Sequence, residues 1–403
     1  MRIPLASSGL RQKDIDQLNI VLNSGKLTMG EEVKKFENLM AEYLGVNHFV
    51  MMNSGSSANL AMLEALMRPT KSSPILAPGD GVLVPAIAWP TTIWPLVQLG
   101  LKPIFVDVDF ENVAIDLVQA QKILNTHKGS VKAIFPIHPL GYTISHRELL
   151  TFSEKNNLIL INDVCESLGS RFDDVHAGTS GYGGSFSFYF SHHITTMEGG
   201  GVATNIDEYA DDLRSIRSHG WSRDRQDVTT WTGEVSNNDA KFLFVSTGFN
   251  IRPMEIQAAV GISQLADVET FIEKRRSIAD RVLGGIKNSG LSLHGSEYLN
   301  PTLRKSHSWM LLPIHIVNSG ESRREGVLRS LEKMQVETRP VLTGNFLSQP
   351  AIRRLNIGNQ NPSDFPIANR ITKESFMVGA HHDLSDEQVN YLVESLIRAD
   401  KEN

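Results

Sequence analysis

The sequence of 403 residues predicts an α/β fold with a central, mostly parallel sheet and a smaller α+β C-terminal lobe. Two observations predict it. From about residue 30 to 205, helical patterns alternate with short apolar runs rich in β-branched and aromatic residues, which is typical of a parallel sheet covered by helices. After a long helical pattern, new strand signals begin near residue 309. The length also exceeds what one hydrophobic core usually supports.

The strands of the sheet are expected where apolar runs leave no polar face. Such runs are typical of parallel strands that are buried on both sides. They are Val82 to Pro85, Pro103 to Val108, Ala133 to Ile137, Leu158 to Asp163 and Ser185 to Phe190.

Helices are expected between and after these strands. The run that begins at Asn205 has an acidic residue three positions on, which predicts a capped helix that carries Leu213 and Ile216 inward. A helical pattern extends from about Met254 through Gly285. New strands are expected at 309–317 and 337–341, and Ser385 with Gln388 predicts a capped final helix. We therefore expect three parts: an N-terminal segment, 1–30, that packs near the small lobe; a large domain, 31–269; and a small lobe, 270–403.

Composition excludes several classes of function. The chain has 39 Lys and Arg against 45 Asp and Glu, a formal net charge of -6, so it has no basic field for nucleic acid or an anionic membrane. Its start lacks a secretory pattern, and no apolar run approaches the roughly 18 residues of a membrane span, so we expect a cytoplasmic protein. Cys165 is the single cysteine, which argues against disulfides and against a cysteine-ligated zinc or iron-sulfur centre. No metal site is expected.

Three segments carry candidate chemistry. The small-residue turn at Asn53 to Ser57, with Gly55 and Ser56, opens a helical pattern; it fits an anion site at a helix amino end and equally an ordinary Ser-capped helix. Asp163 ends an apolar strand, where open α/β sheets place ligand-facing residues; it could pair with a cationic ring nitrogen or cap the following turn. Trp89 follows another strand and could stack on a flat ring or belong to the core.

These segments, in this order, resemble the DegT/DnrJ/EryC1/StrS family of sugar aminotransferases, which are fold type I (aspartate aminotransferase-like) pyridoxal phosphate enzymes. The resemblance spans nearly the whole chain and includes Gly248 to Ala259, which is similar to the family's Gly-Tyr-Asn-x-Arg segment and the helix after it. It implies a homodimer with active sites shared between subunits. It also implies roles for particular residues: phosphate contacts for Gly55, Ser56 and Ser187, ring stacking for Trp89, an ion pair with the pyridine nitrogen for Asp163, and contact with the neighbouring subunit's cofactor for Asn250.

One position departs from the family. His192, in the run from Phe186 to Gly200, stands where the aminotransferases have the lysine that binds the cofactor covalently. No lysine occurs from Asn156 to Ala240, so a shift of register cannot supply one. Imidazole, with a reference pKa of about 6.5, can carry a proton but forms no stable Schiff base. The cofactor, pyridoxal or pyridoxamine phosphate, is therefore expected to be held without a covalent bond, with His192 as acid and base.

Histidine in this slot is similar to a narrower group, the 3-dehydratases of 4-keto-6-deoxy nucleotide sugars. Members that need an iron-sulfur cluster hold it with several cysteines, which this chain lacks. The closer resemblance is to the cluster-free enzymes that act on GDP-4-keto-6-deoxymannose in colitose synthesis, and it implies Glu166 as a carboxylate near the cofactor ring. It also implies L-glutamate as amino donor, with release of 2-oxoglutarate and ammonia and loss of the sugar's C3 hydroxyl.

Other residues have weaker assignments. Five lie in segments that face the site in the family and are candidate substrate contacts: His138, His219, Arg252, Arg339 and Asn345. His193 is expected to be structural. Two alternatives remain open, an aminotransferase for a keto sugar and a catalytically inactive protein that kept the fold. The residues alone do not distinguish GDP from CDP, dTDP or UDP, or one sugar epimer from another.

Overall fold

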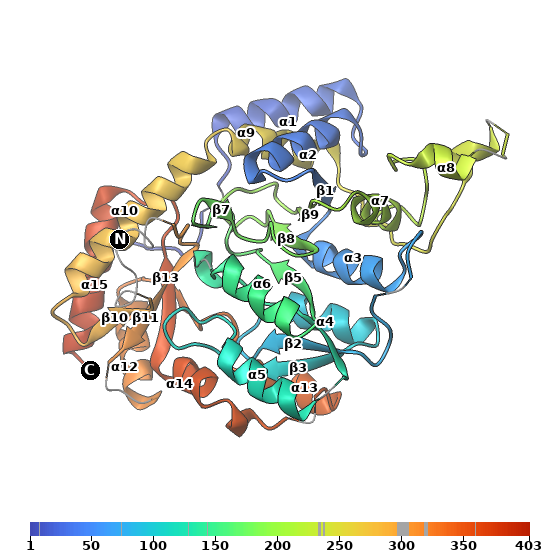
Figure 1. Ribbon diagram of the computed structural model, residues 1–403. Coiled ribbons are helices and arrows are strands. Elements are labelled where there is room, and N and C mark those ends of the chain that lie inside the picture. The colour runs from blue at the N-terminus through green and yellow to red at the C-terminus, as the bar shows by residue number, and fades with distance from the viewer. Residues whose placement is uncertain are drawn as a thin grey trace.

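The computed structural model describes residues 1–403 except 8, 74, 128, 143, 233–234, 237, 296–305, 318–320 and 359. Within the described residues, the large sheet has seven strands in the spatial order β1-β9-β8-β5-β4-β2-β3 (Figure 1). All but one of these strands run in the same direction, and the exception is β9, which is antiparallel to β8 and β1. The strands are β1 (His48–Met52), β2 (Gly81–Pro85), β3 (Lys102–Val106), β4 (Val131–Ile134), β5 (Ile159–Asp163), β8 (Gly183–Ser187) and β9 (Gly200–Thr204).

The five predicted parallel strands are confirmed, with shifted ends. The largest shifts are in β4 and β8, and each of these strands ends three residues before its predicted end. β8 ends at Ser187 because Phe188 to Phe190 leave the sheet and enter the loop that carries His192. Every residue of β1, β2, β8 and β9 is buried, in keeping with helices on both faces of the sheet. The covering helices are α3 (Gly55–Met67), α4 (Pro90–Gln98), α5 (Leu117–Thr126), α6 (His146–Lys155) and α7 (Asp207–Ile216).

The N-terminal helices pack beside the sheet against two helices from the middle of the chain. Helices α1 (Gln12–Ser24) and α2 (Glu31–Leu44) both contact α9 (Glu255–Leu265), and α10 (Val268–Ile286) follows α9 (Figure 1). The sequence predicted one continuous helix here, and that is wrong. The helix is interrupted at Ala266 and Asp267. The Asp267 carboxylate forms ion pairs with Arg11 and Lys13 of the N-terminal segment.

The C-terminal part has its own antiparallel sheet, β10-β11-β13-β12, with helices around it. Ile3 forms a bridge with Val336, and the Arg2 guanidinium lies 2.6 Å from the Glu337 carboxylate, so the first residues contact this part. The division at residues 30 and 269 stays a prediction. The elements are β10 (Leu291–Leu293), β11 (Leu311–Ile316), α12 (Glu321–Lys333), β12 (Thr338–Arg339), α13 (Pro350–Arg354), α14 (Pro366–Glu374), β13 (Ser375–Gly379) and α15 (Asp386–Lys401).

The two predicted caps have different outcomes. Ser385 caps α15 as predicted, since its hydroxyl accepts a hydrogen bond from Gln388 N at 3.2 Å. Asn205 does not cap α7: its Oδ1 accepts from Asn47 N at 2.9 Å, and the helix begins after Ile206 without a side-chain cap. The Asn205 side chain could accept from a backbone N–H of its own helix, but it accepts from the distant Asn47 instead.

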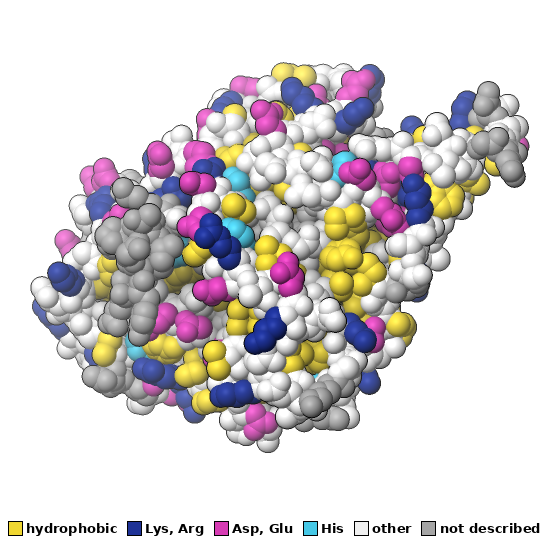
Figure 2. All heavy atoms as spheres, in the orientation of Figure 1, with side chains coloured by type: hydrophobic (Ala, Val, Ile, Leu, Met, Phe, Trp, Pro, Cys, Tyr) yellow, Lys and Arg dark blue, Asp and Glu magenta, His cyan; other side chains and the backbone are white. Residues whose placement is uncertain are grey.

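A segment after α7 projects from the body and carries the short helix α8 (Val228–Thr232) (Figure 1). Lys and Arg side chains are interspersed with Asp and Glu over the face seen in Figure 2. Among the described helices, none combines the length and the apolar character needed to cross a membrane. The remaining short elements are β6 (Arg171–Phe172), β7 (Val175–His176) and the 3-10 turns η1 (Pro139–Gly141), η2 (Asp239–Phe242), η3 (Phe346–Ser348) and η4 (Pro362–Asp364).

Candidate active site

Several sequence-predicted residues meet at the carboxyl edge of the large sheet. Trp89 follows β2, Asp163 ends β5 and Ser187 ends β8, while α3 begins at Gly55 directly beside Ser187. Parallel strands deliver their carboxyl ends to one edge, so residues far apart in the chain become neighbours there. The fold therefore assembles most of the predicted site from one chain.

The amino end of α3 is open for an anion. Ser54 caps the helix, with its Oγ accepting from Ser57 N at 3.1 Å, whereas the N–H groups of Gly55 and Ser56 have no recorded acceptor in the described part of the chain. A Cβ on Gly55 would lie 2.6 Å from the Cβ of Ser187 and 3.0 Å from its Oγ, so only glycine allows this close approach. The helix is Ser-capped, and it retains N–H groups without an acceptor next to a serine hydroxyl; the anion site at its amino end stays a prediction.

Asp163 is a buried carboxylate without a cationic partner among the described residues. Its side chain is 3% exposed. Its Oδ2 accepts from Asn59 Nδ2 at 2.8 Å and from Thr92 Oγ1 at 2.7 Å, and its Oδ1 accepts from Cys165 N at 3.1 Å. A buried charge needs compensation, and three hydrogen-bond donors fix the carboxylate without neutralising it. A protonated ring nitrogen would complete the site.

Trp89 and Glu166 share Arg339 as a neighbour. The Trp89 ring is 44% exposed at the start of α4, and the Arg339 guanidinium lies 5.2 Å from the centre of that ring. Burial raises the pKa of the Glu166 carboxyl, while the Arg339 charge and a hydrogen bond from Leu140 N, at 3.0 Å, act in the opposite direction. The aromatic face, an acid and a guanidinium thus surround the same region as Asp163.

His192 lies in the loop after β8. Its backbone N–H donates to Tyr189 O at 2.9 Å, and its ring lies edge-on to the Tyr189 ring. Its ring Nδ1 is buried without a partner among the described residues. Burial, with the positive charges of Arg275 and Arg339, lowers the pKa of the imidazole to about 3. The ring is therefore neutral at neutral pH, which differs from the near-reference pKa assumed from sequence.

A second group of predicted contacts lies apart from His192 and consists of Asn250, Arg252 and His219. Asn250 and Arg252 line a hollow of about 360 Å³ together with residues such as Trp221 and Met254, and none of the residues around His192 lines it. Arg252 Nε donates to Asn250 Oδ1 at 3.2 Å. His219 is exposed, two residues from the hollow's Trp221, in the left-handed conformation with φ +64°. These three stay predicted contacts, on a surface separate from His192.

Two of the predicted substrate residues have buried side chains with internal partners. His138 is 1% exposed, its Nε2 lies 3.2 Å from Asn162 Oδ1, and burial lowers its pKa to about 4. Asn345 is equally buried: its Nδ2 donates to Pro362 O and Asn369 Oδ1, and its Oδ1 accepts from Leu347 N. The bonds of Asn345 favour a structural part, whereas His138 Nδ1 has no partner among the described residues; both stay predicted contacts.

Three residues that support the site were missed from sequence. Asn59 and Thr92 hold Asp163, and each lies in a segment already singled out, one helical turn after Gly55 and three residues after Trp89. Arg275, in α10, donates from Nη2 to His192 O at 3.3 Å. No local pattern marks Arg275, because its partners are backbone carbonyls from three distant segments.

The arrangement fits pyridoxal phosphate on three counts. Free N–H groups and Ser187 offer a place for a phosphate, Trp89 offers a face for a flat ring, and Asp163 lacks the cation that a protonated pyridine nitrogen provides. The described loop from Phe188 to Gly199 contains imidazole side chains but no amine that could bind the cofactor covalently.

Comparisons with known proteins agree with this geometry. The chain is 36% identical to GDP-4-keto-6-deoxy-D-mannose 3-dehydratase of Yersinia pseudotuberculosis, over 97% of both chains. It is similar to the solved structure of the Escherichia coli enzyme of that name with bound hydrated PLP, with TM-score 0.88 and 34% identity over 98% of this chain and 99% of the other. A structure of GDP-4-keto-6-deoxymannose-3-dehydratase with bound GDP-perosamine gives TM-score 0.88 and 33% identity, over 98% and 100%. The model of the DegT/DnrJ/EryC1/StrS aminotransferase family matches residues 9–397, and the chain belongs to that family.

Proposed function

We propose that this protein is a pyridoxal phosphate/pyridoxamine phosphate-dependent 3-dehydratase that converts GDP-4-keto-6-deoxy-D-mannose to GDP-4-keto-3,6-dideoxy-D-mannose, with L-glutamate as amino donor. The observation that carries the proposal is His192, a neutral imidazole in the loop that holds lysine in aminotransferases. The dehydratase names of relatives that match nearly the whole chain support the choice of sugar and nucleotide. We place the reaction in the cytoplasm, as expected from the sequence.

The chain's own residues would hold the cofactor without a covalent bond. The N–H groups of Gly55 and Ser56 and the Ser187 hydroxyl bind the phosphate, Trp89 stacks on the ring, and Asp163 pairs with the protonated ring nitrogen. When bound, the group supplies an aldehyde or amine for condensation with substrates and a ring that withdraws electrons. Asn59 and Thr92 keep the Asp163 carboxylate in one orientation.

His192 moves the proton in both half-reactions. In the first it takes the α proton of glutamate. In the second it takes a proton from the carbon that bears the transferred amine, and it passes a proton to the C3 hydroxyl, which leaves as water. A neutral imidazole is in the right state to accept each proton. The phosphate of the cofactor and the diphosphate of the substrate would offset the charges of Arg275 and Arg339, and would thereby raise the pKa of the ring toward neutrality.

Glu166 and Arg339 lie where the sugar would meet the ring. Burial raises the pKa of the Glu166 carboxyl, which makes it better suited to exchange a proton with an oxygen of the substrate or cofactor. We further propose a homodimer in which Asn250, Arg252 and His219 serve the neighbouring subunit's site, because they line a surface apart from His192.

The products distinguish this proposal from its alternatives. The enzyme is incubated with pyridoxal phosphate, L-glutamate and GDP-4-keto-6-deoxymannose, and the sugar is analysed by mass spectrometry while ammonia and 2-oxoglutarate are measured. Dehydration gives a sugar with one oxygen fewer and equal amounts of ammonia and 2-oxoglutarate. A 4-amino sugar without ammonia would mean transamination, and an unchanged sugar would mean a binding protein; either result overturns the proposal.

A further inference from the structure

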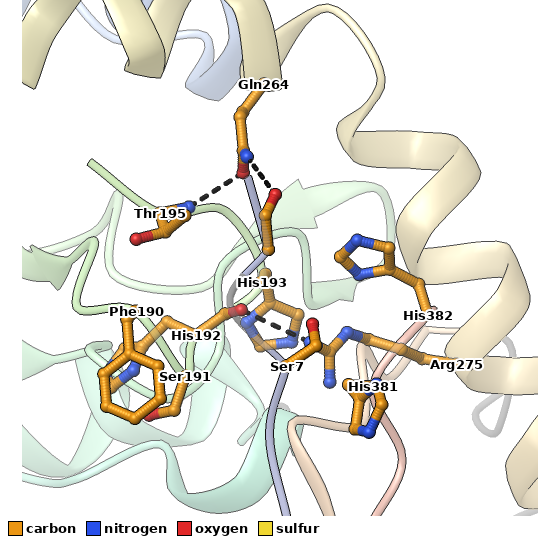
Figure 3. Close-up of a pocket in the computed structure, with 11 residues that line it drawn as sticks. Ser7, Phe190, Ser191, His192, His193, Thr195, Gln264, Arg275, His381 and His382 are labelled. Carbon is orange, nitrogen blue, oxygen red and sulfur yellow. Dashed lines mark hydrogen bonds between the residues drawn. The ribbon is translucent and has the colours of Figure 1, made fainter. Parts of the chain in front are cut away.

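A small cavity is lined by the loop of His192 (Figure 3). It offers about 10 Å³ to the centre of a water-sized occupant, roughly the room for one such particle. Four separate segments enclose it: Ser7 and Gly9 near the N-terminus, the loop from Phe190 to Thr195, α9 and α10 through Gln264 and Arg275, and the residues after β13, His381 and His382.

Unsatisfied polar atoms surround this cavity. His193 is completely buried; its Nε2 lies 3.2 Å from Ser308 O, but its Nδ1 has no hydrogen-bond partner among the described residues. The same holds for Arg275 Nε and for both ring nitrogens of His382. Buried polar groups are almost always hydrogen-bonded, so several orphans around one hole indicate a missing ligand.

The cavity is dominated by positive charge. Arg275 is 1% exposed and forms no ion pair within the described residues; its Nη1 and Nη2 donate only to backbone carbonyls. Asp383 is the acid nearest the histidines, with its Oδ1 3.7 Å from His382 Nε2, but it is half-exposed and accepts from Ser7 Oγ. The charge of Asp383 acts on Arg275, but no described carboxylate forms an ion pair with the buried guanidinium, so its charge is only partly compensated.

Burial and the charge of Arg275 also disfavour protonation of the histidines that line the cavity. Burial, followed by the charge of Arg275, lowers the pKa of His193 well below its usual range and that of His382 to about 4. The lining therefore offers N–H donors from Arg275 Nε and from one ring nitrogen of neutral His382, whereas His193 uses its N–H for Ser308 O and leaves Nδ1 as an acceptor. The described residues contain no group of three or more His, Cys, Asp or Glu side chains arranged to hold a metal ion, which leaves an anion as the charged occupant.

We propose that this cavity is a binding site for one monoatomic inorganic anion, of which chloride is the abundant example. The anion accepts hydrogen bonds from Arg275 Nε and from one ring nitrogen of neutral His382, and it compensates the buried guanidinium. Because Arg275 also donates to His192 O, the bound anion stabilises the catalytic loop. This site is independent of the proposed dehydration.

The first test is thermal unfolding of the holoenzyme in sodium chloride, sodium bromide or sodium gluconate at equal ionic strength. We expect the halides to raise Tm by about 2–4 °C over gluconate, as for a ligand present well above its Kd. In His382→Phe, which can keep the ring stacked on Phe271 but has no N–H, the halide shift should shrink by at least half. The matched control His127→Phe, at an exposed position, should keep it.

The second test does not depend on any variant. Crystals of the wild-type holoenzyme are soaked in sodium bromide, and data are collected at the bromine absorption edge. We expect an anomalous peak in the cavity, in contact with Arg275 and His382. A cavity that holds water without anomalous signal, or a Tm that is the same in halide and gluconate, overturns the proposal.

Discussion

Asp163→Asn tests whether the buried carboxylate pairs with a cationic ring nitrogen. The asparagine side chain has the same shape, and its oxygen can still accept from Asn59 Nδ2 and Thr92 Oγ1. Its amide nitrogen must then lie where Oδ1 now accepts from Cys165 N at 3.1 Å, so that two donors face each other. The substitution therefore removes the charge and one acceptor while it preserves the packing.

The magnitude follows from these contacts. Removing one partner of a buried ion pair costs about 3–5 kcal/mol, which corresponds to roughly 200-fold to 5,000-fold in an equilibrium constant. This loss is expected in the affinity for the cofactor, because the ion pair forms only in the cofactor complex. In the free protein, removal of a buried, uncompensated charge offsets part of the cost of the unsatisfied Cys165 N–H, about 1–3 kcal/mol, so stability should change much less.

The assay is titration of the cofactor-free protein with pyridoxal phosphate, followed by its visible absorbance, together with kcat/KM for the sugar. Asp116→Asn is the matched control: Asp116 caps α5 through Val118 N and Gln119 N, a task asparagine performs equally well, so cofactor affinity should stay the same. If Asp163→Asn binds the cofactor within about twofold of wild type, the carboxylate is not the partner of the ring nitrogen.

Three further changes have expected outcomes. Gly55→Ala should weaken cofactor binding by roughly tenfold or more, because its Cβ would lie 2.6 Å from that of Ser187, whereas Gly284→Ala, with open space at its Cβ, should not; equal affinities in the cofactor titration would refute the phosphate site at α3. Glu166→Gln should lower kcat for dehydration about tenfold or more with little change in cofactor affinity, and an unchanged kcat would remove Glu166 from the chemistry. Burial lowers the pKa of His294 to about 3, below its unfolded value near 6.5, so the stability it contributes is present above pH 6.5 and is lost as the pH falls toward 3; at pH 5.5 the loss is roughly 1.4 kcal/mol. In urea unfolding at pH 7.5 and 5.5, His294→Gln should therefore lose less stability than wild type, and an equal loss would contradict the assignment.

Sequence patterns predicted five of the seven described strands because most of these are apolar on both faces, and they predicted residues at the sheet's edge because those follow the strands. Strands β1 and β9 were not predicted. The His192 loop was identified by its resemblance to the family's lysine loop, and it follows β8. Features that depend on distant partners were not predictable. Asn205 binds Asn47 rather than its own helix, and Asp267 ends α9 by pairing with the N-terminal segment.

The residues that hold the site in place were also not predictable from local patterns. Asn59 and Thr92 are ordinary helix residues until the fold brings both to Asp163. Arg275 looked like one charge on an amphipathic helix, yet it is buried and donates to carbonyls of residues up to 105 positions away. His138 and Asn345 were candidate contacts because their segments reach the sheet edge, but side-chain burial depends on packing that no local pattern encodes.

The central claim is that His192 carries the proton and does not hold the cofactor. The direct measurement is the rate of 2-oxoglutarate formation from glutamate in a single turnover of His192→Asn loaded with pyridoxal phosphate, beside a cofactor titration of the same variant. We predict cofactor affinity within a few-fold of wild type and a rate reduced by about 10²–10⁴, the usual contribution of a general acid–base group. A variant that forms 2-oxoglutarate at the wild-type rate, or one that loses the cofactor altogether, would contradict the account.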